Sequence, residues 1–104
     1  MAATAQKIKK LRIEQEMTIY TAAEMKAQLT GLLKEGTELE LDLSQVGELD
    51  TAGLQLLILV KHQCMAHGGH LKLTGHSQAV LDVLDMCNMI QFFGDPVVIP
   101  SKAH

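Results

Sequence analysis

The sequence predicts a single α/β domain with a mixed β-sheet and helices mainly on one face of that sheet. Residues 38–43 and 70–74 alternate apolar and polar side chains, which is the pattern of half-buried strands. Between them, residues 51–66 form a stretch of helical length. A strand, a helix and a strand with short joints form a βαβ unit with parallel strands and a right-handed crossover.

The alternation of residues 38–43 also predicts how the sheet is covered. Leu39, Leu41 and Leu43 share one side of this strand, while the residues between them are acidic. A strand covered by helices on both faces would be apolar throughout. We therefore expect one face of the sheet to be poorly covered, and binding of a small molecule there is a third, weaker hypothesis for the function.

Length and composition indicate one domain, which we assign to residues 1–104 with its core at about 8–93 and a tail at 94–104. The net charge of −3, without a basic stripe, is the wrong sign for a nucleic-acid-binding protein. The longest apolar run, Leu56–Val60, is far shorter than the roughly 20 residues of a membrane helix. The start of the chain does not resemble a signal peptide. We expect a cytoplasmic protein without membrane insertion.

The first third of the chain is expected to contain two strands and a helix. Residues 7–14 alternate in part and predict a strand, and residues 16–20 are expected to extend into a second short strand. Thr21 with Glu24 forms a capping-box pattern that begins the helix, and Gly36 is expected to end it. Apolar residues at three- and four-residue steps form its buried face: Ala22, Met25, Leu29, Leu32 and Leu33.

The second half of the chain is punctuated by clear caps. Asp50 is a good N-cap for the helix at 51–66, which Gly68–Gly69 should end. Ser77 is expected to cap a third helix, and residues 89–93 predict a last strand. The buried side of the third helix is expected to contain Val80, Leu81, Leu84 and Cys87.

The start of the helix at 51–66 is the most informative segment. Because Asp50 is the N-cap, Thr51 lies in the first turn, where free N–H groups and the helix dipole would stabilise an added anion. Gly53 in that turn costs helix stability, which is explained if another backbone or a partner approaches closely. On physical grounds alone, the simpler interpretation is favoured, namely that Asp50 and Thr51 only cap the helix.

This segment resembles the STAS domain, which occurs in bacterial anti-sigma factor antagonists and in the cytosolic tails of sulfate transporters. The resemblance rests on a strand ending at Asp42, on Val46, and on the block Asp50-Thr51-Ala52-Gly53-Leu54. Gly68-Gly69-His70-Leu71-Lys72-Leu73 is similar to the family's helix-ending glycines before a strand. The order of elements also matches, from about residue 8 to residue 93.

The resemblance implies a regulatory module that binds a protein and is not an enzyme. In antagonists of this family, the hydroxyl residue after the Asp is phosphorylated by a partner serine/threonine kinase that is also the anti-sigma factor. That position is Thr51, and the unphosphorylated form is the one that binds. A phosphate adds about −1.5 to −2 charges. With Asp42, Glu48 and Asp50 expected nearby, it would oppose docking of an acidic or apolar partner face.

Two departures from the antagonist pattern support a second hypothesis. Ala52 follows Thr51 where antagonists commonly have a second hydroxyl, and Thr18 occupies a position where they often have Asp. The block resembles more closely the small STAS subunit of bacterial phospholipid-transport ABC complexes and stand-alone STAS proteins encoded beside chemotaxis kinases. This implies an accessory subunit that contacts an ABC ATPase through Thr51, or a protein that binds a chemotaxis-type kinase.

One face of the helix at 51–66 is expected to bind the partner. Thr51, Gln55, Ile58 and His62 step by four, three and four residues and therefore share a face. Ile58 is expected to be an exposed apolar residue there, although single exposed apolar residues are also normal. The expected partner-binding residues are Asp50, Thr51, Gly53, Leu54, Gln55, Ile58 and His62.

Other chemistry is weakly indicated. His62, Cys64, His67 and His70 do not converge, because the first two point to different faces of a helix, so we expect no metal site. No nucleophile turn, Gly-rich phosphate loop or paired-carboxylate motif is present, and no cofactor is expected. Cys64 and Cys87 are expected to be free, buried thiols. The apolar residues 97–99 suggest a weak homodimer.

Overall fold

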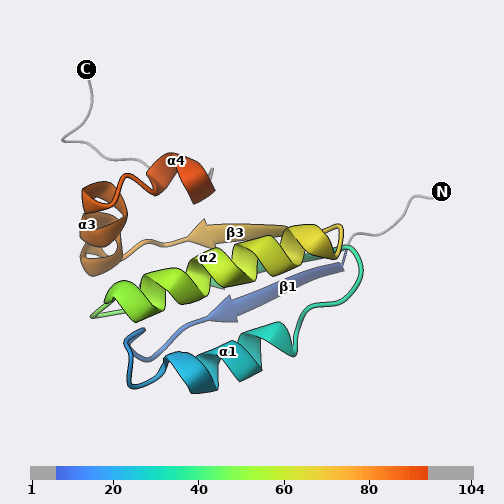
Figure 1. Cartoon of the computed structure of the whole chain (residues 1–104), viewed down its shortest axis with the longest axis horizontal. Coiled ribbons are helices and arrows are strands. Elements are labelled where there is room, and N and C mark those ends of the chain that lie inside the picture. Colours follow the sequence, from blue (N-terminus) through green and yellow to red (C-terminus); the bar gives the residue numbers. More distant parts are fainter. Residues whose placement is uncertain (1–6, 94–104) are drawn as a thin grey trace.

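The computed structural model describes residues 7–93, which form three strands and four helices (Figure 1). In chain order these are β1 (Lys7–Arg12), α1 (Ala22–Thr30), β2 (Thr37–Asp42), α2 (Thr51–Ala66), β3 (His70–Thr74), α3 (Gln78–Met86) and α4 (Ile90–Phe93). The predicted α/β class is confirmed.

The strands lie in the order β1-β2-β3 and all pair in parallel. Leu41 of β2 is opposite Leu11 of β1 and Leu73 of β3. The sheet of the described residues is therefore parallel throughout, whereas a mixed sheet was expected. The predicted strand at 16–20 does not form, and only Met17 makes an isolated parallel bridge, to Leu49.

Hydrogen bonds within residues 18–21 explain why the strand at 16–20 is absent. The Thr21 N–H donates to the Thr18 carbonyl at 2.9 Å, and the Thr18 N–H donates to the Thr21 hydroxyl at 3.0 Å. These bonds close a turn in place of a strand ladder. An alternation of only a few residues cannot outweigh such local side-chain bonding.

Helices α1 and α2 pack against each other, and α2 lies over β2 and β3 (Figure 1). The core between them contains Leu39 and Leu41 from the sheet and Met25, Leu57 and Val60 from the helices, all at most 1% exposed. On the opposite face of the sheet, cross-strand neighbours Lys10, Glu40 and Lys72 are exposed or half-exposed. The charged open face that the alternation predicted is therefore present.

Helix α1 begins where predicted but ends earlier. Thr21 is its N-cap, yet the hydroxyl makes no capping bond: its oxygen accepts from the Thr18 N–H at 3.0 Å, and the hydroxyl donates to the Glu16 carbonyl at 2.7 Å. The capping box is therefore absent. The helix ends at Thr30, and Gly36 with φ +74° belongs to the turn before β2. A glycine at position 31, which costs helix stability, marks this earlier end. The residues that follow it, Leu32 and Leu33, still pack against the core.

The second half of the chain agrees closely with prediction up to α3. Ser77 caps α3 by accepting from the Val80 N–H at 3.2 Å. The predicted strand at 89–93 is instead the short helix α4, whose Phe93 is 4% exposed. A short apolar run does not distinguish strand from helix by its pattern. Residues 97–99, on which the weak homodimer was predicted, lie outside the described residues.

The two cysteines differ in environment. Cys64 on α2 is buried, as expected, and burial raises the pKa of its thiol. Cys87 was expected to be buried, but it follows the last residue of α3 and is exposed. The chain has left the helix at this position, so Cys87 does not continue the buried side that includes Val80 and Leu84. Both thiols are free.

Candidate functional site

Asp50 organises the start of α2. One carboxylate oxygen, Oδ1, accepts from the Gly53 N–H at 3.0 Å and caps the helix. The other, Oδ2, accepts from the Ile19 N–H at 2.9 Å and holds the loop that precedes α1. The bond from Gly53, followed by that from Ile19, lowers the pKa of Asp50 below its ordinary value. The ionised carboxylate therefore joins two segments that are 31 residues apart.

Gly53 is required by the close approach of that same loop. The Met17 carbonyl accepts from the Asp50 N–H at 3.2 Å and lies against the first turn of α2. A Cβ built on Gly53 would lie 2.0 Å from the Met17 carbonyl oxygen, well inside van der Waals contact. The expectation that another backbone approaches Gly53 is confirmed.

Thr51 is the first residue of α2, and its side chain is exposed. Its position combines an accessible hydroxyl with the N-terminal end of a 16-residue helix. A negative group added there would face free backbone N–H groups and the positive end of the helix dipole. The fold can therefore accommodate an anion at Thr51.

The other predicted partner-binding residues do not form one exposed stripe. Gln55 is exposed, but Gly53 and Leu54 are buried, and Leu54 is 7% exposed. Ile58 was expected to be exposed and instead is half-buried against the core, because α2 has core neighbours on a wider face than predicted. His62 is exposed and makes an edge contact with the Phe92 ring of α4, with centroids 5.8 Å apart.

Two features beside Thr51 were missed by sequence reasoning. Ile19 and Tyr20, in the loop before α1, are 69% and 94% exposed. A groove of about 260 Å³ also opens between α1 and α2; we call it the α1–α2 groove, and it is lined by Ala22, Ala23, Lys26, Ala52, Gln55, Leu56 and Leu59. Assigning residues 16–20 to a strand hid the first feature. Alanines at 22, 23 and 52 were the only sequence signal for the second.

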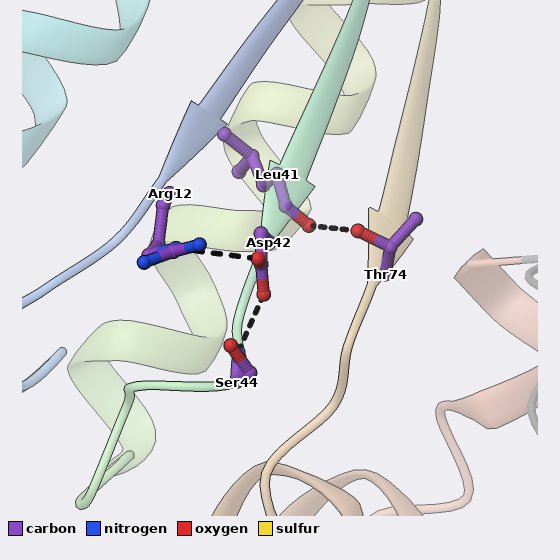
Figure 2. Close-up of polar contacts among 5 residues, drawn as sticks. All are labelled: Arg12, Leu41, Asp42, Ser44 and Thr74. Carbon is purple, nitrogen blue, oxygen red and sulfur yellow. Dashed lines mark hydrogen bonds and ion pairs between the residues drawn. The ribbon is translucent and has the colours of Figure 1, made fainter.

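Asp42 was expected near Thr51, but its carboxylate interacts with Arg12 and Ser44 (Figure 2). Its carboxylate lies 3.5 Å from the Arg12 Nε and accepts from the Ser44 N–H at 2.9 Å. Backbone and side-chain bonds from Ser44 lower the pKa of Asp42, and Arg12 adds to the effect. Beside it the Thr74 hydroxyl donates to the Leu41 carbonyl at 3.4 Å. Asp42 therefore organises the end of β2, next to a shallow hollow of about 220 Å³ on the open face of the sheet.

The described residues contain neither a candidate metal site nor a candidate membrane-spanning helix. Residues 7–93 contain no group of three or more His, Cys, Asp or Glu side chains arranged to hold a metal ion. None of the helices in the same residues is long and apolar enough to cross a bilayer.

Comparisons with known proteins identify the family. The family model described as "Mlab, STAS domain" matches residues 2–97. A search of curated proteins found no match. A candidate anti-sigma factor antagonist from Thermotoga maritima is 20% identical, with a TM-score of 0.75 over 90% of this chain and 82% of that chain in its crystal structure. Its NMR structure has a TM-score of 0.73 at 20% identity, covering 95% of this chain and 81% of that chain.

A sulfate transporter family protein from Wolinella succinogenes is also similar, with 19% identity and a TM-score of 0.72 over 89% of this chain and 76% of that chain. At these identities the structural likeness establishes the fold, while the family match establishes descent. The N-cap Asp50 and the first residues of α2 belong to the block on which the resemblance of the sequence rests. Because one family model spans almost the whole chain, we conclude that this protein belongs to the STAS domain family.

Proposed function

We propose that this protein is a regulatory binding module similar to an anti-sigma factor antagonist. Its partner is a kinase or another protein with a kinase-like ATPase domain, and the contact includes the N-terminal end of α2. Thr51 is the switch. The observation that supports this most directly is the exposure of Thr51, which directly follows the N-cap Asp50 and directly precedes Ala52 of the α1–α2 groove.

A phosphate on Thr51 would act on this contact in two ways. It would add about −1.5 to −2 charges beside Asp50, and repulsion between the two anions would disturb the bond by which Asp50 holds Ile19, and so the shape of the contact surface. It would also have to lose water where the partner covers the apolar α1–α2 groove. Both effects weaken docking, while the start of α2 stabilises the phosphate in the free protein.

The partner-binding residues of this proposal are those that the structure leaves accessible at this end. Thr51 and Gln55 are exposed and contribute directly. Asp50, Gly53 and Leu54 hold the first turn of α2 in place and so position Thr51 and Gln55. Ile58 contributes by packing against the core. A cytoplasmic location, which a partner of this kind requires, stays a prediction.

The alternative function is an accessory STAS subunit of a transport ATPase. The specific observation in its favour is Ala52, which lines the α1–α2 groove where antagonists commonly have a second hydroxyl residue. In that case Thr51 is a contact residue and need not be phosphorylated. The family description "Mlab, STAS domain" is compatible with either function.

The two functions are separated by mapping phosphate. The protein is incubated with a candidate partner kinase and ATP, and modified residues are identified by mass spectrometry. Phosphate at Thr51, with a Thr51→Glu variant that no longer binds the kinase, supports the switch. Gln78→Glu is the matched control, because it adds the same charge at the exposed first residue of α3. An unmodified Thr51 together with a stable complex with an ABC ATPase supports the subunit.

A further inference from the structure

Ile19 and Tyr20 form an exposed apolar pair that the fold holds in place. Their side chains are 69% and 94% exposed, and Tyr20 is the more exposed of the two. The Ile19 N–H donates to Asp50 at 2.9 Å, and the Tyr20 N–H donates to the Thr18 hydroxyl at 3.3 Å. The preceding residue Met17 is fully buried and bridged to Leu49. The backbone is thus fixed on both sides of an aromatic side chain that projects into solvent.

Such an arrangement is suited to binding. A large aromatic side chain on an ordered backbone loses little further entropy when it is buried by a partner. Tyrosine is among the residues that most often contribute a large share of interface binding energy. Ile19 and Tyr20 directly precede the first turn of α1, whose Ala22 and Ala23 line the α1–α2 groove. The apolar pair and the groove therefore both adjoin the start of α1, and the bond from Ile19 to Asp50 places the pair at the end of α2 that carries Thr51.

The charge around this surface is mostly negative. Residues 13–25 and 43–60, which supply most of it, contain no Lys or Arg, and Lys26 is the basic residue that lines the groove. Their acidic residues are Glu14, Glu16, Glu24, Glu48 and Asp50. A second copy of this chain would bring the same acidic residues against them, so self-association through this surface is electrostatically unfavourable. A partner with basic residues around an apolar pocket is complementary.

We propose that Ile19 and Tyr20 anchor this protein in an apolar pocket of a protein partner whose rim carries Lys and Arg side chains. The pocket receives the tyrosine ring, and the basic rim pairs with Glu14, Glu16 and Glu24, which flank the loop in the chain. An apolar part of the partner covers Thr51 and the groove, where a phosphate would lose water without gaining a basic group. The proposal deepens the function proposed above and rests on it, because the anchor lies on the same end of the molecule as Thr51. Asp50 links the anchor to the switch, because its carboxylate accepts from the Ile19 N–H and the residue directly precedes Thr51.

The test uses site-specific photocrosslinking of the full chain in the cells that produce it. Benzoylphenylalanine replaces Tyr20, Gln55 or Met65 in three separate proteins, and crosslinked peptides are sequenced by mass spectrometry. Met65 is the matched control, because it is 56% exposed near the far end of the same helix as Gln55. We expect the probes at Tyr20 and Gln55, but not at Met65, to capture the same protein. The peptide linked to Tyr20 should combine apolar residues with Lys or Arg.

The remaining outcomes count against one or both proposals. Capture from Gln55 but not from Tyr20 overturns the anchor and leaves the proposed function intact. Capture from neither position overturns both. Three other results at Tyr20 overturn the stated partner chemistry. They are a crosslinked peptide without basic residues, a crosslink to a second copy of this chain, and a crosslink to a lipid.

The energetic weight of the anchor is measured with the captured partner, purified together with this protein. Tyr20→Ala should weaken binding at least about tenfold, as loss of a central interface aromatic does. Met65→Ala should leave the affinity unchanged, and the exposure of Tyr20 means that its removal should not lower the melting temperature. Binding should also weaken as salt is raised from about 0.05 to 0.5 M, since screening shortens the reach of surface charges. Wild-type affinity for Tyr20→Ala, or salt-independent binding, would overturn the proposal.

Discussion

Asp50 shows how much one carboxylate can determine in a small domain. Its two oxygens bond different segments, so the residue that caps α2 also sets the position of the loop at Ile19. Both bonds favour the ionised form, and the pKa of Asp50 is lowered accordingly. The protonation state of Asp50 is therefore coupled to the local geometry beside Thr51.

The first prediction concerns pH. Because the pKa of Asp50 is lowered in the folded state, its stabilising contribution is complete above the unfolded pKa of about 3.9 and is lost as pH falls through the lowered folded value. Asp50→Asn should melt at a lower temperature than wild type at pH 7, and the difference should shrink below about pH 4. Asp42 also has a lowered pKa, but it is present in both proteins and cancels in the comparison. A difference that stays constant down to about pH 2 would contradict this role.

Gly53 is the second residue where geometry decides the outcome. Alanine usually stabilises a helix interior by about 1 kcal/mol relative to glycine. Here the added Cβ would lie 2.0 Å from the Met17 carbonyl oxygen, so the backbone must move. We expect Gly53→Ala to lower the free energy of unfolding by about 1–3 kcal/mol, measured by urea denaturation. Gly47→Ala is the control, because a Cβ there meets nothing within 4 Å. Equal stability of the two variants would refute the close approach.

At the scale of elements, α2 divides into faces that its sequence alone does not separate. Leu56, Leu57 and Val60 are in the core, and Ile58 is half-buried against it. Its exposed positions are Thr51 and Gln55 near the start and His62, Met65 and Ala66 towards the end. The element therefore combines a structural role in its middle with accessible surfaces at both ends.

This division predicts different effects of charge on α2. Ile58→Asp was a natural probe of partner binding on the sequence alone, but it should lower the melting temperature, since it places a carboxylate against apolar neighbours. Gln55→Arg should leave the melting temperature unchanged and abolish partner capture, because it alters only the accessible surface. Circular dichroism melting and a pull-down compare the two. An unchanged melting temperature for Ile58→Asp would indicate that its side chain is free of the core.

The open face of the sheet carries a row of alternating charges across its three strands. Glu40 of β2 is directly opposite Lys10 of β1 and Lys72 of β3. Opposite charges facing each other across strands contribute roughly 0.2–1 kcal/mol per pair. Glu40→Lys, which places three lysines in a row, should therefore destabilise the protein more than the neutral Glu40→Gln does. The comparison is made by urea denaturation at low salt, and the gap should narrow in 1 M NaCl as charges are screened.

At the scale of the whole molecule, one core supports every element. The residues that contribute to it come from the sheet, from α1 to α4 and from the connections, including Val46 and Leu49 between β2 and α2. The segment that positions Asp50 is thus fixed by the same core as the strands. A domain of this size has a marginal total stability, of about 5–15 kcal/mol.

Loss of core packing should therefore affect the whole domain at once. Leu57→Ala removes a fully buried side chain and is expected to cost about 2–5 kcal/mol, with the loss appearing in one cooperative transition. Leu59→Ala, at a half-buried position lining the α1–α2 groove, should cost clearly less. Urea denaturation followed by circular dichroism measures both. Separate transitions for the two halves of the chain would show that the core is not shared.

The sequence by itself determined the elements whose signals are local. The bounds of α2 and β3 follow from a side-chain cap at Asp50, helix-ending glycines and strict alternation, all of which act between near neighbours in the chain. The caps at Asp50 and Ser77 were correct for the same reason. The resemblance to STAS domains, read from residues 42–54 and 68–73, was confirmed by the family match.

Only the tertiary structure decided the features that depend on distant segments. It converted 89–93 into a helix and placed Ile58 against the core. It also joined Asp50 to Ile19 and left the next residue, Tyr20, exposed. These outcomes depend on which surfaces meet across 30 or more residues of chain, as the 31-residue separation of Ile19 and Asp50 illustrates. Pattern and propensity describe neighbours along the chain, whereas burial and long-range bonding are set by packing.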